Sequence, residues 1–413
     1  MSAKSHKPVK NFIKTVFLLL ALLSVGACNS HKTNYTVIIS LDGFRWDYPQ
    51  IHHMPFMDSL ASVGVKARME PSFPSSTFPN HYTLATGLVP DHNGIVNNTF
   101  WNPATNYSYS ISDQEARFNP EYYLGEPVWA TAQRQGEKAG VIYWVGSDIP
   151  VGGVYPTYYR NWNEDPHWDF SQRVDEIIRL LSLPEEERPR LVMGYFDEPD
   201  HHGHVYGPLA PETAAMAHSM DSLMRCLYGR LMALPIADKI NFIVTGDHGM
   251  TEISPERFIC IKDVLKEEWL IRASGNTPTS LWVVPECVDS VYNALCGLEH
   301  ISVWKHGEVP EYLNYGTSDR LGDIIVSPDL GWQFNWKPSR NNGTHGFDCK
   351  EEDMLVAFRA IGPDFKKAYE APFTKGDPSA FRNVDIYPLL CHLLGVKPAP
   401  VDGKLERIKK ILK

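Results

Sequence analysis

Three short apolar segments, far apart in the sequence, each lead to an acidic residue, and this pattern restricts the fold more than any other feature of the chain. The segments, each with the acidic residue that follows it, are 35–41 (YTVIISL) with Asp42, 191–196 (LVMGYF) with Asp200, and 241–245 (NFIVT) with Asp247. Continuous apolar runs bounded by turn residues are typical of strands buried on both faces of a parallel sheet. Ligands bind at the carboxyl ends of such strands, so we expect the three carboxylates to gather along one edge.

Helical patterns lie between these segments. An apolar stripe at i, i+3, i+4 and i+7 runs from Val174 to Leu181 and ends at Pro184. Residues 211–234 predict a longer helix with a proline in its first turn. Alternating strands and helices imply an α/β sandwich. Residues 250–340, rich in Trp, Pro and Gly, are a candidate inserted subdomain.

The first 27 residues differ from the rest of the chain. Lysines precede a short apolar run, residues 15–23, and small residues follow before Cys28. This order predicts a secretory signal peptide over residues 1–27, because the run is too short for a transmembrane helix. The sequence VGAC that ends at Cys28 is similar to a bacterial lipobox; a plain signal peptide is the alternative. We therefore expect an exported, periplasmic or cell-surface lipoprotein anchored to a membrane through Cys28, with residues 28–34 as a tether.

Charge and composition exclude several classes of protein. The 413 residues are 43% hydrophobic and 21% charged, which excludes a disordered, fibrous or polytopic membrane protein. Removing the lysines of the signal peptide would move the net charge from −10 to −14. No run of Lys or Arg remains to bind a nucleic-acid backbone, so polymeric nucleic acid is not expected as the principal ligand. The sequence also implies no obligate protein partner. A small anionic substrate would need a local positive centre, which bound metal can supply.

The acidic strand ends lie close to histidines in the sequence, and together they make a candidate metal centre. Asp200 and His204 are four residues apart, so one helical turn brings them together, and His248 follows Asp247 directly. A glycine-containing loop, GTHGFD, can deliver a further imidazole. The full set is three carboxylates and three imidazoles, enough for two four-coordinate ions once a nucleophile or water is added: Asp42, Asp200, His204, Asp247, His248 and His345. Ligand chemistry by itself admits zinc, manganese or cobalt.

Thr77 is the candidate nucleophile, in the sequence PSSTFPNHY. A hydroxyl at the start of a helix can meet a phosphate beside free backbone N–H groups, and metal coordination would lower its pKa. Taken alone, however, a Ser-Ser-Thr run before a helix is typical of a helix N-cap.

These features together resemble the nucleotide pyrophosphatase/phosphodiesterase family of the alkaline phosphatase superfamily, as a bacterial member of the nucleotide-cleaving type. The matching segments occur in the family's order: SLDGFRWDY (40–48), PSFPSSTFPNHYTLATGLVPDHNGIVNN (71–98), DEPDHHGHVYGP (197–208), VTGDHGM (244–250), GTHGFD (343–348) and NVDIYPLLCHLLGVKPAP (383–400). The resemblance implies an alkaline-phosphatase-like three-layer sandwich, with a mostly parallel central sheet and helices on both faces. It also implies one phosphodiesterase catalytic domain over residues 35–411.

The resemblance also implies roles for individual residues and two Zn²⁺ per subunit. Thr77 would attack phosphorus and form a covalent phosphothreonine intermediate, and Asn98, rather than Asn97, would donate to a phosphate oxygen. One zinc would be bound by Asp200, His204 and His345, and the other by Asp42, Asp247, His248 and Thr77.

Phe78, directly after the nucleophile, resembles the aromatic residue that packs against the base in the nucleotide-cleaving branch. The other side of the slot would be formed by Trp162 or by Tyr159. The expected substrate is therefore a small nucleotide or dinucleotide, cleaved at a 5′-phosphodiester or pyrophosphate bond to release a nucleoside monophosphate. A phosphomonoesterase or a phospholipid phosphodiesterase of the same superfamily is the alternative, and a non-catalytic surface lipoprotein is an alternative from a different class.

Overall fold

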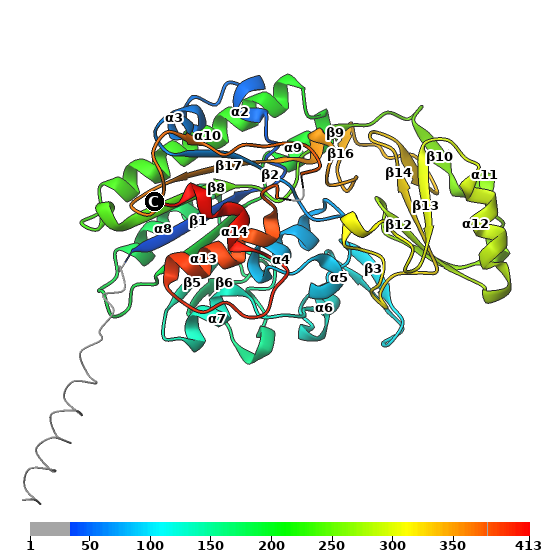
Figure 1. Cartoon of the computed structure of the whole chain (residues 1–413), viewed down its shortest axis with the longest axis horizontal. Coiled ribbons are helices and arrows are strands. Elements are labelled where there is room, and N and C mark those ends of the chain that lie inside the picture. Colours follow the sequence, from blue (N-terminus) through cyan, green and yellow to red (C-terminus); the bar gives the residue numbers. More distant parts are fainter. Residues whose placement is uncertain (1–33, 378) are drawn as a thin grey trace, which may run out of the picture. The chain divides into compact units, whose positions relative to one another are not determined.

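The three predicted strands lie side by side in the middle of an eight-stranded sheet (Figure 1). Strand β1 (Tyr35–Leu41) pairs in parallel with β7 (Leu191–Phe196) on one side and with β8 (Ile240–Thr245) on the other. The strand order is β18-β2-β17-β8-β1-β7-β5-β6. The outer strands are β2 (Val65–Met69), β5 (Ala139–Ile142), β6 (Tyr158–Arg160), β17 (Val356–Ile361) and β18 (Tyr369–Glu370). Only β17 runs antiparallel to its neighbours, so the predicted mostly parallel α/β sheet is confirmed.

This computed structural model describes residues 34–377 and 379–413. The predicted signal peptide, Cys28 and the tether up to residue 33 lie outside the described residues. The described fold begins at Asn34, whose side-chain amide donates to Asp364 Oδ2 over 2.8 Å. Among the described residues, no helix is both long enough and apolar enough to span a membrane.

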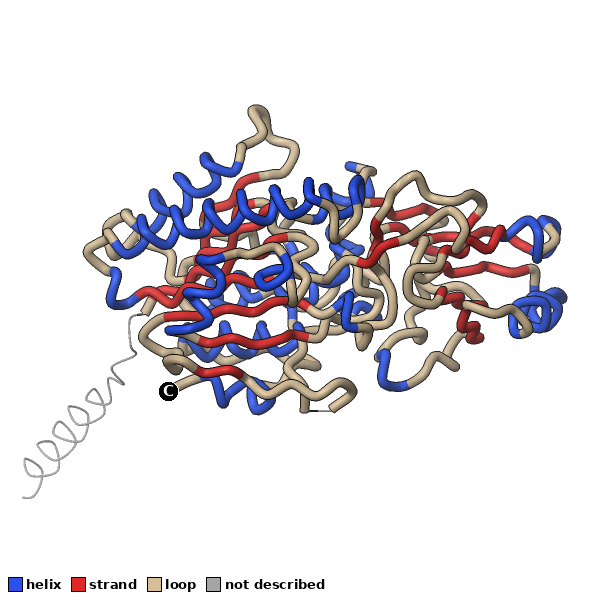
Figure 2. The backbone as a smooth tube through the Cα atoms, turned by 90° about the horizontal axis from the view of Figure 1, so that it is seen from above, coloured by secondary structure: helices blue, strands red, loops and turns tan. Residues whose placement is uncertain are grey.

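Helices cover both faces of the sheet, as Figure 2 shows from above. Along β1, Val37 and Ile39 pack into one apolar core while Ile38 packs into the other, because successive side chains of a strand point to opposite faces. One core is covered by α3 (Pro55–Val63), α8 (Phe170–Leu181) and α10 (Pro211–Met232). The opposite core is covered by α4 (Thr77–Thr86), α7 (Val128–Arg134) and α13 (Ile386–Leu394). The three-layer sandwich is therefore confirmed.

Shorter elements complete this domain. They are the helices α2 (Tyr48–Ile51), α5 (Pro90–Asn93), α6 (Gln114–Arg117), α9 (Asp200–Tyr206) and α14 (Leu405–Ile408), and the hairpin β3 (Thr99–Asn102) with β4 (Tyr107–Ser110).

The segment between β8 and β17 forms a lobe with its own apolar core (Figure 1, yellow and orange). Its main sheet is antiparallel, in the order β11-β12-β14-β13. The elements of the lobe are β10 (Phe258–Cys260), α11 (Ile261–Val264), β11 (Leu270–Ser274), β12 (Thr279–Val283), α12 (Val288–Cys296), β13 (Ile301–Lys305), β14 (Ile324–Pro328) and β15 (Gln333–Asn335). The lobe therefore occupies most of the segment 250–340, for which the sequence suggests an inserted subdomain.

A short antiparallel pair, β9 (Thr251–Glu252) with β16 (Gly343–Thr344), joins the two ends of the lobe at the edge of the sandwich. The lobe also contacts the sandwich directly, since the Tyr315 hydroxyl donates to the Val96 carbonyl over 3.1 Å. These contacts position the chain that leaves β16, which carries His345.

Candidate active site

The parallel register brings the predicted carboxylates to one edge of the sheet. Strands β1 and β7 end in register, Leu41 opposite Phe196, and Asp42 follows at once with its amide donating to the Phe196 carbonyl over 2.9 Å. The amide of Asp200 in turn donates to the Asp42 carbonyl over 3.1 Å. Asp42 and Asp200, which follow two strands far apart in the sequence, therefore lie at the same edge of the sheet, as the sequence pattern predicts.

The first group of ligand-type side chains is Asp42, Asp247 and His248, and all three are buried. The Nε2 atom of His248 lies 3.3 Å from Asp42 Oδ1 and 3.1 Å from Asp247 Oδ2. The amide of Gly43 donates to the other Asp247 oxygen over 3.1 Å, which fixes the orientation of that carboxylate. This buried group is built wholly from the ends of neighbouring strands.

The second group is Asp200, His204 and His345. Asp200 begins helix α9 and His204 lies one turn later, with its Nε2 atom 3.4 Å from Asp200 Oδ2. His345 follows β16, where the chain returns from the lobe, and its Nε2 atom lies 3.8 Å from Asp200 Oδ1. Its ring stacks on that of His248 with centroids 3.6 Å apart, so the two groups are direct neighbours.

The three histidines present the same ring nitrogen to the carboxylates. In each ring Nδ1 lies near a backbone carbonyl oxygen: His204 near Gly343 (2.8 Å), His248 near Gly249 (2.8 Å) and His345 near Ser75 (3.0 Å). A carbonyl oxygen can only accept, so each Nδ1 carries a proton, and Nε2 is the ring nitrogen that can bind a cation. Metal-binding histidines are oriented in this way by partners of the other ring nitrogen.

Each carboxylate of these groups keeps one oxygen without a hydrogen-bond partner among the described residues. Asp42 Oδ1, Asp200 Oδ1 and Asp247 Oδ2 are buried atoms with no hydrogen bond among the described residues. Burial, together with the nearby carboxylates of Asp247 and Asp200, raises the pKa of Asp42 well above its ordinary value. Burial also opposes ionisation of Asp247, but His248 and His81 lower the pKa of that carboxyl. Unpartnered carboxylate oxygens beside free imidazole nitrogens fit bound cations, and each group's ligand atoms lie within 4.8 Å of one another.

Thr77 is the first residue of helix α4, and Ser76 occupies the N-cap position. The Thr77 hydroxyl therefore does not cap the helix; its Oγ1 lies 3.1 Å from His248 Nε2. The structure thus brings the predicted nucleophile to the metal-ligand groups. The alternative interpretation of this segment, a hydroxyl that serves as a helix cap, does not describe Thr77.

Asn98 lies beside the start of the same helix. Its Oδ1 accepts from the Phe78 amide over 2.9 Å, so its NH₂ group is left to act as a donor. The side chain of Asn97 points to the lobe instead, where its Nδ2 donates to the Pro278 carbonyl over 3.2 Å. The choice of Asn98 over Asn97 therefore agrees with the geometry, whereas the donor role itself stays a prediction.

A cavity of about 250 Å³ extends from the ligand groups to an aromatic wall. Thr77, Asp42 and Asp200 line it, together with Phe78 and Trp162. The Trp162 ring is itself supported by Tyr143, with centroids 5.1 Å apart. The predicted substrate residues Phe78 and Trp162 thus share one cavity with the predicted nucleophile.

Tyr159, the other candidate for the stacking position, does not reach this cavity. It lies in the edge strand β6, is 44% exposed, and stacks on Tyr155 with centroids 5.0 Å apart. The polypeptide turns after β6, and the ring three residues later, that of Trp162, faces the cavity.

Two residues close to the ligand groups carry no clear signal in the sequence or only a weak one. The Tyr195 hydroxyl donates to Asp42 Oδ2 over 2.6 Å, and the Nδ1 atom of His81 lies 3.2 Å from Asp247 Oδ2. His81 is a buried core residue, and its ring contacts the Asp247 carboxylate. A signal existed for His81, because it lies four residues after Thr77 on one face of the helix. No local pattern pointed to Tyr195.

An arginine and an aspartate at the same cavity were also not predicted. Arg117 and Asp148 both line it, and burial raises the pKa of Asp148 while the Arg117 charge opposes that shift. The Nε and Nη2 atoms of Arg117 are buried without a hydrogen-bond partner among the described residues. The cavity thus offers free polar donors as well as aromatic faces.

The fold and the site define an alkaline-phosphatase-like α/β protein with two candidate metal-ligand groups at its strand ends. Residues 36–348 match the family model described as type I phosphodiesterase/nucleotide pyrophosphatase, and the chain belongs to this family.

Several family members are similar over most of the chain. Human ectonucleotide pyrophosphatase/phosphodiesterase family member 1 is 32% identical over 402 residues, which cover 92% of this chain and 42% of the human protein. Venom phosphodiesterase 2 of Crotalus adamanteus is 32% identical over 393 residues, which cover 91% of this chain and 47% of the venom protein. The chain thus spans less than half the length of these curated relatives.

Solved structures of the family are also similar over most of the chain. Murine ectonucleotide pyrophosphatase/phosphodiesterase 5 superposes with a TM-score of 0.84 at 32% identity, covering 92% of this chain and 100% of that chain. An inactive threonine-to-alanine variant of the murine protein, solved in complex with AMP, superposes with the same TM-score at 31% identity.

Proposed function

We propose that this protein is a secreted two-zinc nucleotide pyrophosphatase/phosphodiesterase, which hydrolyses nucleoside 5′-phosphodiester and pyrophosphate bonds and releases nucleoside monophosphates. The observation that carries the proposal is that three carboxylates near Thr77 each keep one buried oxygen with no hydrogen-bond partner among the described residues, and that two of them, Asp42 and Asp200, line the same cavity as Thr77. The AMP complex of the inactive murine threonine-to-alanine variant supports both a threonine nucleophile and a nucleotide substrate.

Two zinc ions are the proposed cofactors. Asp200, His204 and His345 would bind one ion, and Asp42, Asp247 and His248 would bind the other, with Thr77 as a further ligand. When bound, such ions act as Lewis acids that lower the pKa of a coordinated hydroxyl and neutralise charge on phosphoryl oxygens. Zinc is preferred over manganese or cobalt because the chain belongs to this family.

The covalent chemistry belongs to Thr77. Its Oγ1 attacks phosphorus, the bond from phosphorus to the leaving oxygen breaks, and the leaving alcohol or phosphate takes up the proton that Thr77 loses. Water then hydrolyses the phosphothreonine diester, which restores the hydroxyl and releases the nucleoside monophosphate. Asn98 supports both steps, because its NH₂ group is free to donate to a phosphoryl oxygen while its Oδ1 is tied to the Phe78 amide.

The aromatic wall selects the nucleoside half of the substrate. Phe78 and Trp162 line the cavity beside Thr77, and base–aromatic stacking contributes about 1–3 kcal/mol per base. Stacking tolerates any base, because every base has a π-face. We therefore expect broad acceptance of nucleobases.

Hydrolysis of the nitrophenyl ester of thymidine 5′-monophosphate, measured beside nitrophenyl phosphate with and without chelator, tests the proposal. We expect a large preference for the diester that is lost on chelation and restored by zinc. Preference for the monoester would contradict the assigned reaction and indicate a phosphomonoesterase. Absence of turnover on both substrates would contradict the nucleotide assignment and direct the search to phospholipid diesters.

We also propose export and lipid anchoring through Cys28. The sequence VGAC that ends at Cys28 supports this proposal, and these residues lie outside the described part of the chain. In a bacterial host, a Cys28→Ala variant should fail to incorporate labelled palmitate and should leave the membrane fraction. Unchanged membrane association would contradict the anchor.

A further inference from the structure

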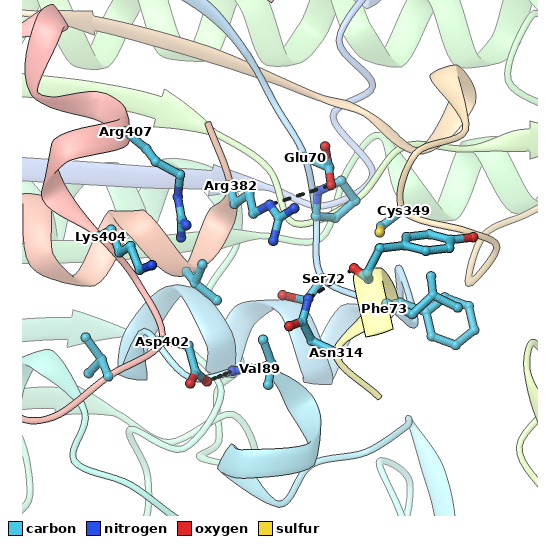
Figure 3. A pocket seen from close by; sticks show the side chains of 15 residues that line it. Glu70, Ser72, Phe73, Val89, Asn314, Cys349, Arg382, Asp402, Lys404 and Arg407 are labelled. Carbon is cyan, nitrogen blue, oxygen red and sulfur yellow. Dashed lines mark hydrogen bonds and ion pairs between the residues drawn. The ribbon is translucent and has the colours of Figure 1, made fainter. Parts of the chain in front are cut away.

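A second cavity, of about 440 Å³, shares no lining residue with the cavity that contains Thr77 (Figure 3). Its walls come from distant parts of the sequence: Glu70 after β2, Cys349 beyond the His345 loop, Arg382 before α13, and residues 401–407 near the end of the chain. The volume lies within the range of roughly 300–1,000 Å³ that is usual for small-molecule sites.

Three cationic side chains line one part of this cavity, those of Arg382, Lys404 and Arg407. Figure 3 shows them extending from neighbouring segments toward the same space, with Glu70 beside Arg382. Arg407 is held in place by Asp385, whose oxygens accept from its Nε over 2.8 Å and from its Nη2 over 2.7 Å. A guanidinium fixed in this way is a rigid part of the wall.

The other two cations have unused donors. The Nε atom of Arg382 is buried without a hydrogen-bond partner among the described residues, and the nearest carboxylate oxygen of Glu70 lies 3.8 Å away. Within residues 34–377 and 379–413, the Lys404 ammonium has no hydrogen-bond or ion-pair partner; its backbone amide donates to Asp385. Positive charge in this cavity is therefore only partly compensated by the protein.

The acidic groups that line the cavity are Glu70 and Asp402. Asp402 Oδ2 already accepts from the Val89 amide over 2.9 Å and lies 2.8 Å from His92 Nδ1. Glu70 is buried, and burial raises the pKa of its carboxyl, which reduces its negative charge toward lower pH. Figure 3 shows Glu70 beside Arg382, on the side away from Lys404, and Asp402 directed toward Val89.

We propose that this cavity binds a phosphate group between Arg382 and Lys404, with Arg407 adding long-range attraction. A guanidinium fork and an ammonium approaching from one wall match an anion with three or more oxygens better than a carboxylate with two. The group can come from inorganic phosphate or from a small phosphomonoester. The site is independent of the proposed hydrolytic function.

Equilibrium dialysis of the metal-loaded protein with radiolabelled inorganic phosphate tests this site. Lys404→Met removes an ammonium that has no hydrogen-bond or ion-pair partner in the described part of the chain, and Arg382→Gln removes the second donor group. Lys410→Met is the matched control, because Lys410 is exposed and lies outside the cavity. We expect each of the two cavity variants to lose one bound phosphate per chain or to bind it at least about tenfold more weakly. The control should behave as the wild type.

Competition distinguishes the two sources of the group. Stronger displacement by glycerol 3-phosphate indicates a phosphomonoester, and weaker displacement indicates the free ion. Wild-type phosphate binding in both Lys404→Met and Arg382→Gln would overturn the proposal, and equal displacement by acetate would overturn the assignment to phosphate. Neither variant changes the metal-ligand groups, so phosphate bound there should stay bound in both. The outcome of this test is therefore independent of whether the proposed hydrolytic function is correct.

Discussion

The two ligand groups have the same chemistry but are built in different ways. Asp42, Asp247 and His248 follow adjacent strands of one sheet, and their side chains are 0–4% exposed. In the other group, Asp200 and His204 are 15% and 23% exposed, and His345 reaches them only after the chain has passed through the lobe. A sheet edge thus creates a rigid, dry group, whereas the second group depends on the packing of a helix against a returning loop.

The proposed nucleophile lies beside the buried group, with Thr77 Oγ1 3.1 Å from His248 Nε2, and its loss should have the largest effect because no other group replaces the attacking oxygen. Thr77→Ala should lower kcat for the thymidine diester by at least about a thousandfold while both ions stay bound, because the three carboxylates and three imidazoles are untouched. Steady-state kinetics and metal analysis of the same sample measure this. Thr77→Ser is the control and should keep substantial activity; turnover by the alanine variant close to wild type would contradict the nucleophile.

Timed chelation should separate the two groups. The ion bound by the more exposed group should leave first, because chelator and water reach Asp200 and His204 more readily than the buried carboxylates. Metal content measured over time should therefore fall in two phases, and His204→Ala should lack the fast phase. Activity should fall at least about a hundredfold when the first ion is lost. Release in a single phase would contradict the difference between the groups.

Removing a support of the buried group should have a smaller effect. Tyr195→Phe deletes the 2.6 Å hydrogen bond to Asp42 and keeps the aromatic ring. Loss of a residue that orients a metal ligand typically lowers metal affinity or activity by about 10–100-fold, and we expect an effect of this size. Zinc titration followed by activity measures it. Wild-type zinc affinity together with wild-type kcat would show that the hydroxyl does not matter.

The smallest effect is expected at the aromatic wall of the cavity, which belongs to neither ligand group. Trp162→Ala should raise KM for the thymidine diester about tenfold through loss of stacking and leave activity on methyl nitrophenyl phosphate nearly unchanged. Tyr159→Ala is the matched control, since Tyr159 is exposed at the edge strand. Equal effects of the two variants would contradict the assignment of Trp162 to the base.

Much of the site follows from local sequence patterns. The strand-end carboxylates could be predicted because parallel pairing aligns the ends of buried strands, and the pair Asp200 and His204 because one helical turn separates them. His81 could have been found in the same way from its spacing to Thr77, but the role of Tyr195 could not. Nothing in the sequence near Tyr195 indicates that its hydroxyl lies 2.6 Å from Asp42, since this contact joins two different strands.

The sequence by itself determined the α/β class, the three strand ends and the identity of the ligand-type residues, because each depends on periodicity and spacing over a few residues. Only the tertiary structure decided that Trp162 rather than Tyr159 faces the cavity beside Thr77 and that Arg117 and Asp148 line it. The same holds for the formation of a basic cavity around Arg382. These features depend on how segments tens to hundreds of residues apart pack together. Long-range packing is the sum of many weak contacts, so no short stretch of sequence specifies it.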